Sequence, residues 1–461
     1  MSSKYSMMAI AVFSAFFSDA AMSRPLLPEL QQVIVEHPLI KSARKSVESS
    51  DYSRDAARSG YFPKLTISGD RGRERISSSS YQAVNNQIDN SSVRQKPQES
   101  DLTRQKILTV IEQNLFAGGR TSALVGIAEI DFAAQENAFR TTMQNTLLEA
   151  LTVYLQVGRY KTLIAIAKRN EETTQKQLRL EDARVQRGGG IAVDVLQAKT
   201  RLQIAKERLV FQEQGLRDAM AQYRQVFGHQ PDLDKIQDVD TLNGHLPASL
   251  EEAIETSLQL SPVLKESVLL SQKAIKQIRL EQAGFMPTID LVGINGHDKN
   301  ANALADRDER SLLLKMNWNL FAGGETVSRS RAATANHESV LEREVNVSRK
   351  VEESVRIAWH QLVNGRERQD LLENAANISY EVMQNRKRLR DAGKETAINV
   401  LDAEVEYFGV LSNRINAMYE TRVGSYRLLA AMGQLTPKLL GLDQATFAVP
   451  VKPMELKFDV Q

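Results

Sequence analysis

The chain contains two copies of one pattern, and this repetition constrains its fold more than any other feature. The motif Gly-Tyr-Phe-Pro at 60–63 returns as Gly-Phe-Met-Pro at 284–287, 224 residues later. Two further motifs return with a shift of 205 residues: Leu-Phe-Ala-Gly-Gly at 115–119 and 320–324, and the segments 193–198 and 398–403. Each half is therefore one structural unit, and the first copy carries a 19-residue insertion in its strand region.

Each repeat is expected to hold the same elements in the same order. Repeat 1, residues 21–228, has a helix from Pro38, strands near 63–75 and 105–115, a long helix over 120–187 and a return helix over 191–228. Repeat 2, residues 262–433, has a helix from Pro262, strands near 287–297 and 310–320, a long helix over 325–392 and a return helix over 396–433. A connector, 229–261, and a C-terminal tail, 434–461, are predicted to lie at one level as an equatorial belt.

Composition excludes several classes of protein. The 461 residues carry 25% charged side chains but a net charge of only +2, so the concentrated basic surface of a nucleic-acid-binding protein is missing. The chain has no cysteine, which excludes disulfides, thiolate metal sites and a lipid-modified N-terminal cysteine.

The N-terminus resembles an export signal. Lys4, an apolar run over 7–17 and the small residues Ser18 and Ala20 predict a signal peptide at 1–20. A disordered apolar start is the alternative. No later stretch is long and apolar enough for a transmembrane helix, so an exported chain of this kind is either soluble beyond the inner membrane or inserted as a barrel.

The predicted strands alternate in polarity. From Leu312 to Leu320 every second residue is apolar, and the residues between them are mostly polar. This pattern fits a half-buried strand of a soluble sheet or a strand of a membrane barrel. The segments between the paired strands, 77–100 and 295–310, are hydrophilic, as expected of extracellular barrel loops.

Glycines and prolines mark the ends of these elements. Pro63 and Pro287 precede the first strand of each pair, and strand-to-helix turns are predicted at Gly118, Gly119, Gly323 and Gly324. The long helices, each ~100 Å at 1.5 Å per residue, break at Gly188, Gly189 and Gly190 in the first repeat and at Gly393 in the second. In the return helices, residues spaced by seven from Val195 and from Leu401 form a coiled-coil seam, which Arg422 interrupts in the second copy.

Four strands cannot close a barrel, and an open edge in lipid leaves backbone groups unpaired. Oligomerisation is therefore required. Two copies give eight strands, whose interior side chains fill the barrel, whereas three copies give twelve strands and leave room for a passage. Three copies also give twelve helical columns, one for each strand.

The signal peptide and the three duplicated motifs together resemble the TolC family of outer-membrane export channels, over nearly the whole mature chain from about Leu30 to Gly433. The resemblance implies a mixed α/β membrane protein. Its fold would be a homotrimeric, 12-stranded β-barrel in the outer membrane, continuous with a long α-helical coiled-coil tunnel in the periplasm. It also implies partners: a periplasmic adaptor protein at the tunnel tip, and an inner-membrane ABC transporter or other pump that supplies the energy.

Family resemblance also assigns candidate gate residues at the periplasmic tip. Asp194 matches a position that links neighbouring coils, and Asp402 matches one member of an inward-facing acidic ring. The chain departs from the family pattern at two positions. Asn399 stands where the second ring carboxylate is usual, and Glu395 stands where the best-known member has a gate-locking arginine. Lys394 or Arg390 would have to replace that arginine.

An enzyme and a soluble structural coiled coil are the competing classes. The six histidines show no metal-ligand spacing, and Gly118-Gly119-Arg120 lacks the lysine of a phosphate-binding loop, so we predict no catalytic residue, metal or cofactor. A soluble coiled coil does not explain the strand pairs or the signal peptide.

The cargo is predicted from resemblance alone. The segment 283–291 resembles the form common among channels of type I secretion systems, and the missing cysteine sets the chain apart from the lipid-anchored drug-efflux branch. We therefore expect a passive conduit for type I protein secretion. Efflux of small molecules or drugs is the alternative.

Overall fold

The computed structural model describes residues 26–78, 81–82, 93–94, 98–189, 191–239, 242–302 and 305–442. The expected signal peptide, Gly190 and the tail beyond residue 442 lie outside these residues. The chain divides into two compact units, and both repeats contribute to each, which corrects the expectation that each half is one structural unit. Of the described residues, the helical unit takes 26–43, 140–262 and 349–442, and the sheet unit takes 44–139 and 263–348.

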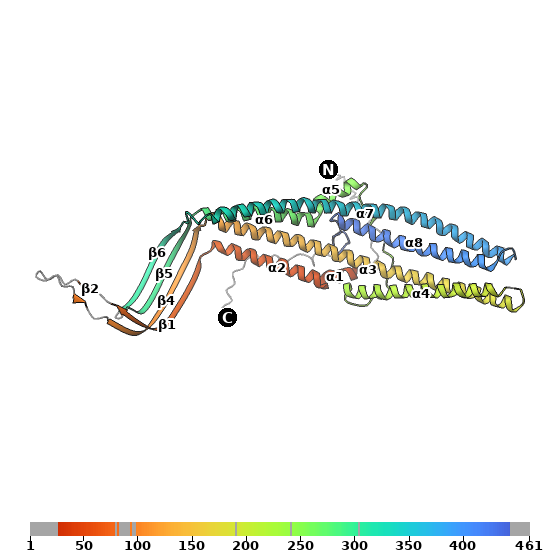
Figure 1. The fold of residues 1–461 in the computed structure, drawn as a ribbon, viewed down its shortest axis with the longest axis horizontal. Helices are drawn as coiled ribbons and strands as arrows, with labels where there is room; N and C mark the ends of the chain where they lie inside the picture. The colour runs from red at the N-terminus through yellow and green to blue at the C-terminus, as the bar shows by residue number, and fades with distance from the viewer. Residues whose placement is uncertain are drawn as a thin grey trace, which may run out of the picture. The chain divides into compact units, whose positions relative to one another are not determined.

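The sheet unit holds a four-stranded antiparallel sheet in the order β1-β4-β5-β6 (Figure 1). Its strands are β1 (Lys64–Ser78), β4 (Gln98–Phe116), β5 (Thr288–Asn302) and β6 (Ala305–Asn317). The two hairpins meet where β4 pairs with β5, so β1 and β6 are edge strands, and each has one side that no described strand pairs with. Two short strands, β2 (Tyr81–Gln82) and β3 (Val93–Arg94), pair with each other.

The register places most large apolar side chains on one face of the sheet. Leu65 pairs with Ile111, and Leu291 pairs with Leu314, so these residues share a face. That face is exposed in the single chain, and Leu314 is 69% exposed. On the opposite face, Arg104 of β4 contacts both neighbouring strands. Its Nε lies 2.8 Å from Asp298 of β5, and its Nη1 lies 3.4 Å from Glu74 of β1.

The strands extend beyond the predicted ends, which corrects the assignment of 295–310 as a loop. β5 continues to Asn302 and β6 begins at Ala305. Cross-strand pairs of polar residues hold this extension, such as His297 Nδ1 at 2.7 Å from Asp308 Oδ1. The sequence analysis followed apolar alternation, which ends where the polar pairs begin. The final strand was also predicted too long, because β6 ends at Asn317 and not at residue 320.

The strand-to-helix turns use the predicted glycines. Gly118 and Gly323 have the same φ of 61°, and Gly119 and Gly324 have φ values of 86° and 84°. These left-handed conformations favour glycine because it has no Cβ. Pro63 and Pro287 directly precede β1 and β5, after the short 3-10 helices η1 (Ser59–Tyr61) and η3 (Ala283–Phe285).

The helices come in pairs related by the repeat. α2 (Pro38–Arg58) matches α6 (Pro262–Gln282), α3 (Arg120–Gln186) matches α7 (Glu325–Asp391), and α4 (Ala192–Phe227) matches α8 (Ala397–Ala431). The structure adds one pair that the sequence analysis missed: α1 (Leu26–Glu36) and α5 (Leu250–Leu260), again 224 residues apart. The connector is therefore partly helical and also contains a short 3-10 helix, η2 (Asn243–His245).

The helical unit is held by apolar contacts around the return helices. Val195, Ala198 and Leu202 of the predicted seam on α4 are buried, as are Leu401, Phe408 and Ile415 on α8. A second cluster joins α5, α7 and α8, and it contains the buried residues Ala253, Val355, Ala358, Leu362, Leu428 and Met432. Figure 1 shows α8 running alongside α7 within this unit.

Within the described ranges, the helices do not include one that combines the length and apolar character needed to cross a membrane.

Candidate functional site

Two helix turns in the helical unit carry the predicted gate residues, and both turns end their long helix in the same way. After α3, Gly188 has a φ of 75°, and the Gly189 N–H donates to the Arg184 carbonyl at 3.0 Å. After α7, Gly393 has a φ of 70°, and the Lys394 N–H donates to the Leu389 carbonyl at 2.9 Å. These bonds cap the helix and let the chain reverse direction within a few residues.

The turn after α7 is organised by three polar residues. Thr396 is the N-cap of α8, and its hydroxyl accepts a hydrogen bond from the Asn399 N–H at 3.4 Å. The Asn399 side-chain amide donates to the Glu395 carboxylate, which also accepts the Thr396 N–H at 3.2 Å. The hydrogen bond from Asn399 is the main reason that the pKa of Glu395 is lowered. Glu395 and Asn399 therefore compensate each other, since a carboxylate at position 399 would repel Glu395.

Asp402 lies one helical turn further along α8 and has a cationic partner. Arg201 of α4 reaches it, with 2.7 Å between Nη2 and Oδ1, and both side chains are about half-exposed. This ion pair joins the two return helices. Asp194 lies in the first turn of α4. Among the described residues, it shares no hydrogen bond or ion pair with Glu395, Asn399 or Asp402.

A buried ionic cluster near these turns was not predicted. Glu404 on α8 is fully buried, and its Oε1 lies 2.8 Å from Lys387 of α7 and 3.4 Å from the Gln177 amide of α3. Arg390 of α7 also donates to Gln177. The cluster therefore ties three helices together. Its sequence signal is Glu404 itself, a carboxylate three residues after Leu401 on the apolar seam.

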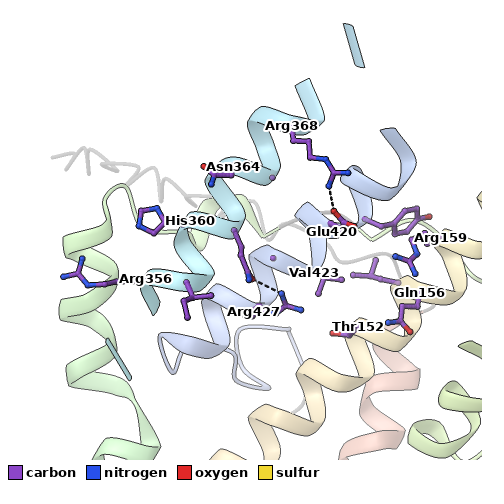
Figure 2. Close-up of a pocket in the computed structure, with 16 residues that line it drawn as sticks. Thr152, Gln156, Arg159, Arg356, His360, Asn364, Arg368, Glu420, Val423 and Arg427 are labelled. Carbon is purple, nitrogen blue, oxygen red and sulfur yellow. Dashed lines mark hydrogen bonds and ion pairs between the residues drawn. The ribbon is translucent and has the colours of Figure 1, made fainter. Parts of the chain in front are cut away.

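A cavity in the helical unit lies between α3, α7 and α8, has a volume of about 850 Å³ and is strongly basic. Arg159, Arg356, Arg368 and Arg427 line it, and Glu420 is its one carboxylate. Figure 2 shows Arg368 directed at Glu420, a 2.8 Å ion pair. The sequence analysis missed this cavity because its charges come from three helices that are far apart in the chain.

The site contains no arrangement of catalytic type in the part of the chain that is described. No group of three or more histidine, aspartate or glutamate side chains there is placed to hold a metal ion. The polar groups at the helix turns are instead engaged in helix capping and in ion pairs between helices. This arrangement can fix helices relative to one another.

Comparison with known proteins supports the interpretation that the chain is a channel protein. The family model of the outer membrane efflux protein matches residues 30–229 and 253–434. The chain is 26% identical to the outer membrane efflux protein BepC of Brucella suis, covering 93% of this chain and 90% of BepC. It is 20% identical to the outer membrane protein TolC of Escherichia coli (93% and 86% covered) and 21% identical to the alkaline protease secretion protein AprF of Pseudomonas aeruginosa (95% and 90% covered).

Solved structures show the same fold. A membrane protein from Pseudomonas aeruginosa superposes with a TM-score of 0.76 at 17% identity, covering 89% of this chain and 93% of that one. The open state of the Neisseria gonorrhoeae MtrE outer membrane channel superposes with a TM-score of 0.73 at 15% identity, covering 94% and 98%. The predicted fold of four strands per chain with long helices is confirmed. The chain belongs to the outer membrane efflux protein family and is an export channel of the outer membrane.

Proposed function

We propose that the chain is the outer-membrane conduit of a type I protein secretion system. Three copies form the channel, a periplasmic adaptor docks at the helix turns, and an inner-membrane ABC transporter supplies the energy. The channel itself is passive. The observation that carries the channel assignment is the sheet, which has an exposed apolar face and two open edges within one chain.

Sheet geometry supports a closed assembly in lipid. The four strands contain 15, 19, 15 and 13 residues, and a tilted strand needs roughly 9 to 11 residues to cross the hydrocarbon layer. The edges β1 and β6 must find partners, because unpaired backbone groups in lipid cost several kcal/mol each. Three sheets joined edge to edge give the proposed barrel of twelve strands, with the apolar face toward lipid and the face of Arg104 and Asp298 toward the lumen.

Two helices of the helical unit also expose apolar side chains in stripes. On α7, Leu371, Ile378, Val382 and Leu389 are exposed at the 7-4-7 spacing of a coiled-coil seam. On α4, Val193, Leu196, Ile204 and Phe211 are exposed along a second stripe. We propose that α4 of one subunit packs against α7 of the next. This packing closes the ring of helices that forms the periplasmic tunnel.

The gate is proposed at the helix turns. Asp194, Glu395, Asn399 and Asp402 all lie in or next to these turns, and Gly188 and Gly393 permit the reversals there. Glu395 cannot act as the locking cation of the family pattern. Arg201 and Arg390 supply cations that link different helices, which supports the proposal that they hold the closed state.

Protein cargo is the finer part of the proposal. Its support is the similarity to AprF, which is named for secretion of an alkaline protease, over 95% of this chain. The resemblance of segment 283–291 to type I secretion channels agrees with it. BepC, at 26% identity, is named an efflux protein, and this favours small-molecule or multidrug efflux as the second candidate function.

Deletion of the gene tests the two candidates in one experiment. We expect at least one abundant protein to disappear from the culture supernatant and to return when the gene is supplied on a plasmid. The supernatant is measured by quantitative mass spectrometry, and sensitivity to dyes and detergents is measured in parallel. Unchanged secreted proteins together with sharply increased sensitivity would overturn the secretion proposal and favour efflux.

A further inference from the structure

The basic cavity between α3, α7 and α8 is kept open by small residues on two facing helices. A Cβ atom at Gly365 would lie 3.2 Å from the Thr421 hydroxyl, and a Cβ at Gly424 would lie 3.8 Å from Leu362. Gly365 therefore lets α7 and α8 approach closely, whereas a Cβ at Gly424 would make an ordinary van der Waals contact. Side chains of ordinary size at both positions would narrow the cavity.

Four arginines from three helices line the basic cavity. They differ in whether a carboxylate neutralises their charge. Arg368 is paired with Glu420 of α8, and Arg356 is paired with Glu352 at 2.7 Å. Among the residues that the structure describes, Arg427 donates only to the neutral amide of Gln361, at 2.9 Å.

Arg159 lacks a carboxylate partner among the described residues. It lies over the ring of Tyr160, and its buried Nε has no hydrogen-bond acceptor there. Arg159 and Arg427 therefore offer two cations whose charge nothing on the wall of the cavity balances. A bound anion would satisfy both of them through charge-assisted hydrogen bonds.

The wall between the arginines is partly apolar. Leu155 of α3, Ile357 of α7 and Val423 of α8 line it (Figure 2 labels Val423 at its centre). The cavity volume falls in the range of about 300 to 1,000 Å³ that is typical of sites for organic ligands. A simple inorganic anion would leave the apolar surface uncovered, whereas an apolar body with several acidic groups would satisfy both kinds of surface.

We propose that this cavity binds an amphipathic organic polyanion, that is, an apolar or aromatic body with two or more carboxylate, sulfonate or phosphate groups. Arg159 and Arg427 contact the acidic groups, and the wall formed by Leu155, Ile357 and Val423 contacts the apolar body. The proposal concerns a binding site of the chain itself and goes beyond its role as a conduit. It holds whether the main cargo is protein or a small molecule.

The test uses the full-length protein in lipid nanodiscs and the fluorescent trianion 8-hydroxypyrene-1,3,6-trisulfonate, followed by fluorescence anisotropy. We expect saturable binding with one site per chain, weakened by added salt. The double variant R159Q/R427Q should bind about tenfold more weakly or worse, because two charge-assisted hydrogen bonds are lost. E420Q should bind more tightly, because it removes the one carboxylate of the wall and frees Arg368.

A matched control comes from α4. Arg217 also donates to a neutral glutamine, Gln214 at 3.1 Å, and to no other residue in the described part of the chain. It lies outside the cavity, so R217Q should bind the probe as the unchanged protein does. If the double variant fails to fold, the affinity of E420Q for the probe still tests the proposal. The proposal is overturned if the unchanged protein shows no saturable binding, or if R217Q loses as much affinity for the probe as the double variant. It is also overturned if E420Q binds the probe more weakly than the unchanged protein does. Equally strong binding of the aromatic cation ethidium at the same site would overturn it as well.

Discussion

At the scale of single residues, Arg422 shows how a charged group is accommodated on a helix seam. It falls in the heptad series of Leu401, Phe408 and Ile415, where an apolar residue is expected. Its guanidinium lies over the ring of Tyr419 and donates to Asp238 of the connector, to which the Tyr419 hydroxyl also donates at 3.0 Å. The arginine therefore anchors the connector to α8 and does not simply weaken the seam.

This anchor predicts a pH dependence. Burial alone would raise the pKa of Asp238, but the hydrogen bond and charge of Arg422, with the Tyr419 hydroxyl, lower it below its ordinary value of 3.8. Because the folded pKa is the lower one, the stabilisation is complete above about pH 4 and is lost as the pH falls through the folded pKa. At pH 7, D238N should speed hydrogen–deuterium exchange of the amides at 236–239 by a factor of about 2 to 5, as expected for a partly exposed pair.

The difference between D238N and the unchanged protein should shrink as the pH falls below about 4, after correction for intrinsic exchange rates. D232N is the matched control, because Asp232 pairs with Lys235 at 3.0 Å on the exposed surface of the same connector. It should leave the amides at 237–239 unchanged, and the Ile236 amide is left out of the comparison because it donates to the Asp232 carbonyl. An equal effect of both variants, or a difference that persists unchanged at low pH, would contradict the anchor.

Single residues were only partly predictable. Glu395 and Asn399 stood out in the sequence because both depart from the family pattern, and the structure places them in contact. Glu404 was missed although it interrupts a seam, because its stabilisation by Lys387 and Gln177 depends on helices α7 and α3, which sequence periodicity does not place. The same reason explains the missed pair of Arg201 and Asp402.

At the scale of elements, the two strand-to-helix turns look alike in sequence but differ in their surroundings. Gly118 and Gly323 both have a φ of 61°. A Cβ atom at Gly118 would lie 2.5 Å from Met286 Cβ and 2.8 Å from the Ala283 carbonyl oxygen, whereas a Cβ at Gly323 meets nothing within 4 Å. The turn after β4 is packed against the segment that precedes β5, and the turn after β6 meets no other part of the described chain at Gly323.

These two glycines form a matched pair of variants. Alanine in the left-handed conformation should lower the free energy of unfolding by about 1 to 2 kcal/mol in both G118A and G323A. In G118A the free energy of unfolding should fall by a further ~1 to 3 kcal/mol, because the added methyl group forces the backbone near Met286 to shift. Thermal unfolding followed by circular dichroism measures the loss, and G118A should have a lower Tm than the unchanged protein. A G118A protein with an unchanged Tm would show that the turn at Gly118 is not packed as described.

Helices and strands were predictable to different degrees. The long helices were predicted within one residue at each end, because proline-free periodicity and the glycine caps are local signals. The strand ends were missed, since the polar cross-strand pairs at His297 and Asp308 give no local alternation of apolar residues. α5 was missed despite Ser249, whose hydroxyl caps the Glu252 N–H at 3.2 Å, in the spacing of a capping box.

At the scale of the whole molecule, the charge at the proposed entrance predicts ion selectivity. Three copies of Asp402 in a narrow ring would favour cations, and Arg201 at 2.7 Å partly neutralises each of them. D402N should therefore lower the cation selectivity of the channel in planar bilayers, and R201Q should raise it. Reversal potentials in a salt gradient measure both changes.

D232N in the exposed connector serves as the control for this experiment and should leave the reversal potential unchanged. Opposite shifts in D402N and R201Q would distinguish an effect at the entrance from a general loss of structure, which would move both in the same direction. A D402N channel with unchanged selectivity would remove Asp402 from the proposed entrance.

The general architecture was predictable because the chain repeats itself. The 224- and 205-residue shifts predicted two equivalent halves, and the structure contains the paired strands and helices that they imply. The basic cavity was not predictable, since no single segment of the chain is unusually basic there. Its charge arises only when Arg159 of α3, Arg356 of α7 and Arg427 of α8 are brought together.

The two open edges of the sheet have a kinetic consequence. Since β1 and β6 each lack a second partner strand among the described residues, that part of a single copy leaves both sheet edges open. Completion of the fold and association with other copies then become one event, and its rate depends on the local concentration of newly exported chains. A cell that makes this protein slowly must shield the free edges during that delay, because an unpaired strand accepts any available strand as a neighbour.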